Sequence, residues 1–137
     1  MQKLTALVLF ALGAISIGVL VSGASYSEWL LPGGLPLGNA LAAIGLCSLA
    51  GSAYKLSPVG SVRRRISQAV LVVTVLWLPI SIALAGNLEL NFSGSRGTAW
   101  LIISSATVIA VLGSLALAIA GALLYKPHDA GTREEIA

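Results

Sequence analysis

Four long runs of apolar residues dominate the chain, and none of them contains Asp, Glu, Lys, Arg or His. Short segments that carry the charges and most of the prolines connect them. The runs cover Leu4–Val21, Leu37–Ala53, Ile66–Ala85 and Ala99–Leu124. A helix needs about 20 apolar residues to cross a hydrocarbon core roughly 30 Å thick, and each run is near that length or longer. The pattern therefore predicts an all-α fold, an integral membrane four-helix bundle with four transmembrane helices.

The basic residues alternate between the two sides that such a chain would have. Seven of the eight Lys and Arg residues fall in the N-terminus, the middle connection or the C-terminal tail, which would share one side, and only Arg96 falls on the other. The seven are Lys3, Lys55, Arg63, Arg64, Arg65, Lys126 and Arg133. Cytoplasmic segments of membrane proteins carry an excess of Lys and Arg. We therefore expect both termini to be cytoplasmic, and we interpret Arg63, Arg64 and Arg65 as a topology anchor in contact with lipid head groups.

The spans and their connections use almost the whole length of the chain. We expect a single four-span transmembrane domain over residues 1–125 and a short polar cytoplasmic tail over residues 126–137. The first span also resembles a secretory signal, because Ser22-Gly23-Ala24 matches the small-x-small pattern of a cleavage site. Its apolar run is long enough to span, so we expect a retained helix.

Composition narrows the class of protein further. Hydrophobic residues make up 57% of the chain and charged residues only 9%, whereas about a quarter of the residues in a soluble domain are charged. The net charge of +3 comes from residues beside the membrane spans, without the exposed aromatics that stack on nucleic-acid bases. We expect membrane lipids as partners and no nucleic acid. The Ala-, Gly- and Leu-rich composition favours a multi-pass protein of a bacterial plasma (inner) membrane.

Residues that could carry chemistry are scarce within the spans. Ion-coupled transporters keep ionisable side chains in the membrane, and these spans contain none except the thiol of Cys47. The one histidine, His128, follows the last span, and no His, Cys, Asp and Glu cluster at metal-ligand spacing. Membrane serines have no acid or base partner at their depth. We therefore predict no catalytic residue, no metal ligand, no cofactor and no enzymatic activity.

Small side chains recur along the last span and predict a helix-packing interface, because they let another backbone approach closely. The positions are four residues apart, and Val111 and Leu115 are expected to lie off this series. Shorter series occur at Ala14, Gly18 and Ser22 and at Ala43, Cys47 and Gly51. The predicted interface residues are Ala106, Ala110, Ser114, Ala118 and Ala122.

Three other features, an amide, a tryptophan and a loop, predict further contacts. Asn39 carries an amide near the outer mouth of its span, where it could hydrogen-bond a partner or a ligand. Trp77 lies too deep for the interfacial aromatic belt and should face another helix or lipid. In the loop Gly86–Thr98, apolar and polar residues alternate, which predicts a short strand or a lip over the bundle.

Two functions remain compatible with these observations. The leading hypothesis is a small non-catalytic membrane protein that acts as an accessory or structural subunit, or as an interaction partner, within a larger membrane complex. Its partners would be other integral membrane subunits or further copies of itself. The alternative is a small homo-oligomeric transporter or channel for a neutral or weakly polar solute.

Overall fold

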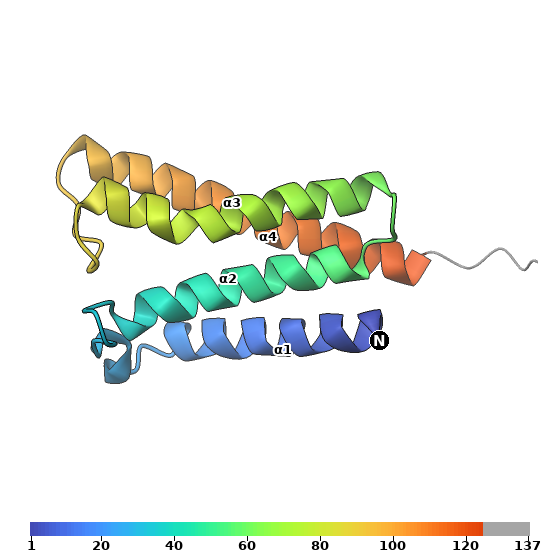
Figure 1. The fold of residues 1–137 in the computed structure, drawn as a ribbon, viewed down its shortest axis with the longest axis horizontal. Coiled ribbons are helices and arrows are strands. Elements are labelled where there is room, and N and C mark those ends of the chain that lie inside the picture. Colours follow the sequence, from blue (N-terminus) through green and yellow to red (C-terminus); the bar gives the residue numbers. More distant parts are fainter. Residues whose placement is uncertain (125–137) are drawn as a thin grey trace, which may run out of the picture.

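The computed structural model describes residues 1–124 and confirms the all-α four-helix prediction (Figure 1). All four long helices are sufficiently apolar to cross a membrane, so the chain is a multi-pass membrane protein. The polar tail predicted at 126–137 lies outside the described residues. The elements are α1 (Gln2–Val21), a short 3-10 helix η1 (Ser25–Glu28), α2 (Leu37–Leu56), α3 (Val62–Ala85) and α4 (Ser95–Leu124).

The helix ends follow local capping rather than hydropathy alone. Ser61 caps α3 with its hydroxyl, which accepts a hydrogen bond from the Arg64 backbone N–H at 3.2 Å. Gly86 ends the same helix in the left-handed conformation, with φ 78°, which glycine adopts without steric cost. Helix α4 begins at Ser95, four residues before the expected start of the apolar span at Ala99. Polar residues can continue a helix beyond the hydrocarbon core, so the apolar run underestimates its length.

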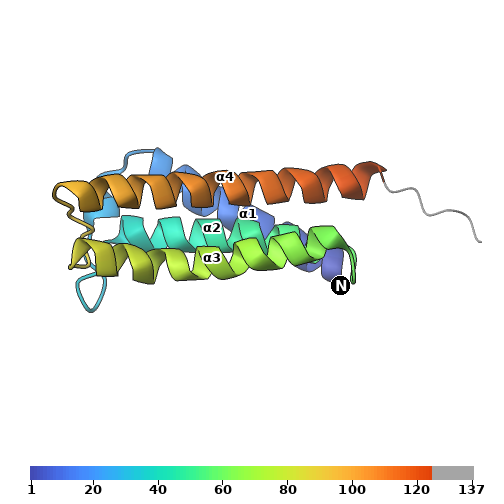
Figure 2. The same cartoon turned by 90° about the horizontal axis from the view of Figure 1, so that it is seen from above.

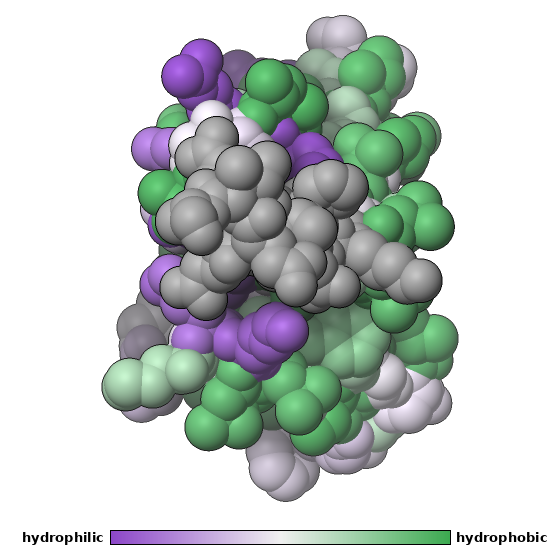
Figure 3. All heavy atoms as spheres, turned by 90° about the vertical axis from the view of Figure 1, so that its right-hand side faces the viewer, coloured by the Kyte–Doolittle hydropathy of each residue, from purple (hydrophilic) through white to green (hydrophobic). Residues whose placement is uncertain are grey.

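The two ends of the bundle differ in charge. Figure 1 shows the N-terminus, the α2–α3 connection and the end of α4 together at one end. We call this the basic end, because it carries Lys3, Lys55 and the three arginines that open α3. The opposite end, here the far end, carries η1, the α3–α4 loop and Arg96. Seen end-on, the basic end shows hydrophilic residues beside strongly apolar flanks (Figure 3).

Helix α2 is the centre of the bundle. It packs against α1, α3 and α4, and α3 also packs against α4 (Figure 2). Helix α1, in contrast, packs extensively against α2 alone (Figure 1). The core consists of α2, α3 and α4 residues, including Ala50, Ala53 and Val111, which are fully buried. Helix α1 is therefore an outlying element attached to a three-helix core.

The α1–α2 interface depends on glycines. A Cβ atom added at Gly13 would lie 2.7 Å from Cγ of Leu49, and one added at Gly45 would lie 2.6 Å from Cδ1 of Ile17. One hydrogen bond also crosses this interface, from the Ser52 hydroxyl to the backbone carbonyl of Ala6 at 2.9 Å. The two backbones thus approach as closely as small residues allow, which is the usual basis of helix pairing in membranes.

Tryptophan–serine hydrogen bonds join α3 and α4. The Trp77 indole N–H donates to the Ser104 hydroxyl at 2.9 Å, and the Trp100 indole N–H donates to the Ser81 hydroxyl at 3.1 Å. Trp77 is 6% exposed, so it faces neighbouring helices, which is one of the two surroundings expected for it.

The small-residue series of α4 does not stay on one face. Successive helical residues turn by about 100°, so positions four apart drift by about 40° at each step. The structure buries Ser114 and Ala118, partly buries Ala110 and exposes Ala106 and Ala122.

The buried face of α4 consequently includes two residues that were expected to lie off the series. Val111 is 0% exposed and Leu115 is 7% exposed, so this expectation was wrong. Together with Thr107, Ser114 and Ala118 they form the surface of α4 that packs into the bundle.

Candidate functional site: two cavities between α1 and α4

Two cavities lie where α1 and α4 diverge over α2. One, of about 750 Å³, lies at the far end, and the other, of about 690 Å³, lies at the basic end. Both are lined by residues of α1, α2 and α4. They follow from the packing, because α1 contacts α2 closely and leaves the space toward α4 unfilled.

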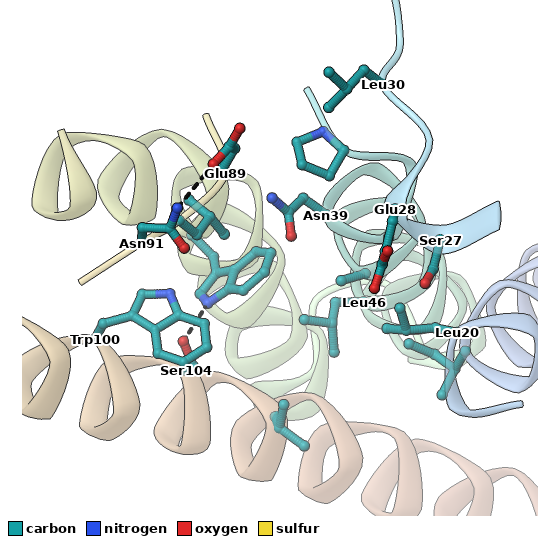
Figure 4. A pocket seen from close by; sticks show the side chains of 17 residues that line it. Leu20, Ser27, Glu28, Leu30, Asn39, Leu46, Glu89, Asn91, Trp100 and Ser104 are labelled. Carbon is teal, nitrogen blue, oxygen red and sulfur yellow. Dashed lines mark hydrogen bonds between the residues drawn. The ribbon is translucent and has the colours of Figure 1, made fainter. Parts of the chain in front are cut away.

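The far-end cavity has a polar rim and an apolar interior. Carboxylates of Glu28 and Glu89 belong to its rim, and Trp100 forms part of its wall (Figure 4). Trp77 also lines it. Both indole N–H groups already donate to serines, as described above. The lining contains no Lys, Arg or His. The deeper wall is aliphatic, with Ile17, Leu20, Ala42, Leu46 and Val108.

Asn39, the predicted polar contact, lies at this rim. Its amide Nδ2 donates to the backbone carbonyl of Leu88 at 3.0 Å, and so ties the start of α2 to the α3–α4 loop. In Figure 4 the Asn39 side chain lies between Glu28 and Glu89. The contact therefore fixes the shape of the cavity mouth within one chain.

The α3–α4 loop forms a lip, and no strand occurs in its described backbone. Asn91 Nδ2 donates to a carboxylate oxygen of Glu89 at 2.9 Å. The Phe92 ring stacks on Trp100, with ring centroids 4.9 Å apart. These contacts hold the loop against the far end of α4, beside the cavity.

The basic-end cavity is mainly apolar. Lys3 lies at its α1 side, and Gly121 lies on its α4 side. Ala122, the last member of the predicted series, lines this cavity. It is exposed, so it is not packed against another helix of the described chain. The remaining lining residues are Ala6, Leu7, Phe10, Ser52, Leu56, Pro58 and Ile119.

The three arginines of the predicted anchor have different surroundings. Arg64 donates to the Tyr54 hydroxyl at 2.9 Å and to the Ser57 carbonyl at 3.4 Å, and its guanidinium lies 4.2 Å from the Tyr54 ring centroid. The Arg63 guanidinium lies directly against Gly121, in the space that a side chain at position 121 would take. Arg65 is exposed. Arg64 therefore stabilises the α2–α3 connection, while Arg63 and Arg65 can reach the membrane surface.

Hydroxyl groups within the spans largely bond to their own helix. Thr74 donates to the Val70 carbonyl at 2.7 Å, and Thr107 donates to the Ile103 carbonyl at 2.8 Å. Among residues 1–124, no three His, Cys, Asp or Glu side chains lie close enough together to hold a metal ion. Cys47 is a half-buried free thiol.

Sequence patterns did not single out Lys3 or Gly121 as parts of a site. A glycine within an Ala-rich span has no distinctive neighbours in sequence, and its role depends on Arg63 of another helix. Comparison with known protein families, with characterised proteins and with solved structures finds no match for this chain.

Proposed function

We propose that this chain is a non-catalytic accessory subunit of a larger membrane complex, residing in a bacterial inner membrane with both termini cytoplasmic. The observation that supports this function best is an exposed strip of small residues on α4: Ala106, Gly113 and Ala120. We call it the outer strip. It faces away from the three-helix core and has no packing role within the described chain.

The outer strip keeps to one face because its members are seven residues apart. Seven residues turn a helix by about 700°, only about 20° short of two full turns. A Cβ added at Gly113 would have no neighbouring atom within 4 Å, so the space above it is open. Ile109, 70% exposed, and Leu117, 54% exposed, stand beside the strip. Small residues between large ones are the surface into which another membrane helix can pack closely.

Replacing Gly113 by Leu should remove the association without unfolding the chain. The added side chain would fill the open space and keep a partner backbone at a distance. After gentle detergent extraction from native membranes, we expect the wild type to run as a complex and Gly113→Leu to run at the mass of the single chain.

Ala69→Leu is the matched control, because Ala69 is also small and exposed but lies on α3. This variant should retain the complex. If Gly113→Leu retains it too, the outer strip faces lipid and the proposal is wrong.

The second candidate is a small homo-oligomeric transporter or channel for a neutral or weakly polar solute. The far-end cavity of about 750 Å³ favours it, because it opens where a solute could enter between the helices. The bonding of Thr74 and Thr107 to their own backbones argues against a polar path deeper in the bundle. Solute flux through liposomes that contain the pure protein would favour this candidate over the first.

The proposed orientation predicts which residues can be labelled from outside the cell. In a Cys47→Ala background, Ser93→Cys at the far end should react with an impermeant thiol reagent on intact cells. Val59→Cys, at the basic end and 75% exposed in the wild type, should react only after permeabilisation. The opposite labelling pattern would place both termini outside.

A further inference from the structure

The basic-end cavity combines apolar walls with one cationic lining residue, and a second cationic residue contacts its lining. Leu7 and Phe10 of α1 face Ile119 of α4 across it. Lys3 lies at its rim on α1, and Arg63 lies against Gly121 on the other side. We propose that this cavity binds one anionic phospholipid, with an acyl chain between α1 and α4 and the phosphate between Lys3 and Arg63.

Charge complementarity identifies the occupant as an anion. The two acidic residues of the described segment, Glu28 and Glu89, both lie at the far end. Lys3, Lys55 and three arginines lie at the basic end. Arg64 is bonded to Tyr54, whereas Lys3 lines the cavity and Arg63 lies against Gly121, which also lines it. Basic pockets between transmembrane helices bind the head groups of anionic lipids.

The apolar walls identify the rest of the occupant. A free phosphate or a soluble anion would leave the surfaces of Leu7, Phe10 and Ile119 without a partner. A molecule that is apolar along its length and anionic at one end fits both parts of the cavity, and anionic phospholipid is the one that the surrounding membrane supplies. The lipid would fill the space that the close α1–α2 packing leaves between α1 and α4.

The position of the Arg63 guanidinium depends on the absence of a side chain at Gly121. The Arg63 guanidinium occupies the position that a Cβ at residue 121 would take, so Gly121→Ala must move the arginine. Gly18→Ala is the control, since Gly18 is also a helical glycine and its Cβ would meet no atom within 4 Å. Both changes replace glycine by alanine within a helix and so favour the helix equally.

The test uses the full chain, stripped of native lipid in detergent, with added phosphatidylglycerol or with phosphatidylcholine of identical acyl chains. Native mass spectrometry should show one bound phosphatidylglycerol, and the unfolding temperature should rise with this lipid and not with phosphatidylcholine. Glycerol phosphate, which is the head group alone, should not compete. If it competes fully, the site binds a free anion and the lipid assignment is wrong.

Charge variants locate the site. Lys3→Gln combined with Arg63→Gln should weaken phosphatidylglycerol binding on the order of tenfold or more, because each basic residue contributes to head-group attraction. Lys55→Gln changes a charge at the same end, but the Lys55 ammonium lies beside the Tyr54 ring and outside the cavity lining, whereas Arg63 contacts the lining residue Gly121; this variant should have a much smaller effect. Gly121→Ala should weaken binding and Gly18→Ala should not. Equal binding of both lipids, or equal losses in Lys55→Gln and the double variant, would overturn the proposal.

Discussion

Replacing Trp77 by Ala should destabilise the bundle by about 2–4 kcal/mol, the largest effect expected of a single truncation here. Trp77 is 6% exposed and belongs to the core shared by α2, α3 and α4. Truncation of a packed tryptophan leaves a cavity and removes its dispersion contacts, which typically costs about 3–5 kcal/mol in water-soluble cores. We expect a smaller loss of stability here than in a water-soluble core, because the side chain of the unfolded protein is also surrounded by apolar lipid groups. Unfolding in mixed micelles at increasing SDS fraction measures the change.

Two further variants separate packing from the hydrogen bond. Trp77→Phe keeps much of the ring volume but loses the donor to Ser104, so it should cost less than Trp77→Ala. Trp29→Ala removes a tryptophan that is 68% exposed, and it should leave stability nearly unchanged. If Trp29→Ala and Trp77→Ala destabilise equally, the three-helix core does not depend on Trp77 as described.

The four spans were predictable because each apolar run is uninterrupted by charge. A charged side chain within the hydrocarbon core carries a large energetic cost, so runs without charge mark the spans. The boundaries were less predictable. Helix α4 continues through the polar residues Ser95, Arg96 and Thr98, where side chains can reach water and hydropathy no longer reports helix.

The spacing of small residues explains why only part of the predicted α4 series is buried within the chain. A spacing of four drifts around the helix, whereas a spacing of seven stays on one face and is the repeat of helices that cross at small angles. In α2, Gly38, Gly45 and Ser52 are seven apart, and all three contact α1 or η1. In α1 the buried Ala6 and Gly13 have the same spacing. The residues singled out in α1, such as Gly18, are exposed.

The candidate sites could not be predicted, since they depend on contacts between groups far apart in the sequence. Asn39 was recognised as polar, but its partner is the backbone carbonyl of Leu88, which no side-chain pattern reveals. The two cavities arise because α1 approaches α2 and not α4, and this depends on glycines in both partners. A sequence shows that small residues are present, and the structure shows which pairs of them meet.

Replacing Gly13 by Leu should detach α1 from α2. The added Cβ alone would lie 2.7 Å from Leu49 Cγ and 3.1 Å from the Gly45 carbonyl oxygen, and the backbone oxygen cannot move independently of its helix. Overpacking of this kind costs about 1–3 kcal/mol. Separation of the helices would also break the Ser52–Ala6 hydrogen bond. We expect a lower SDS midpoint of unfolding and faster proteolysis in the loop between α1 and α2.

Gly18→Leu is the control within the same helix. A Cβ at Gly18 would meet no atom within 4 Å, so a leucine there should point into lipid at little cost. Both variants gain the same helix propensity, roughly 1 kcal/mol for replacing glycine. Their difference therefore reports the α1–α2 contact alone. Equal stability of the two variants would show that α1 is not held against α2 at Gly13. A large loss in Gly13→Leu with none in Gly18→Leu would establish that close backbone approach, rather than apolarity, attaches α1 to the core.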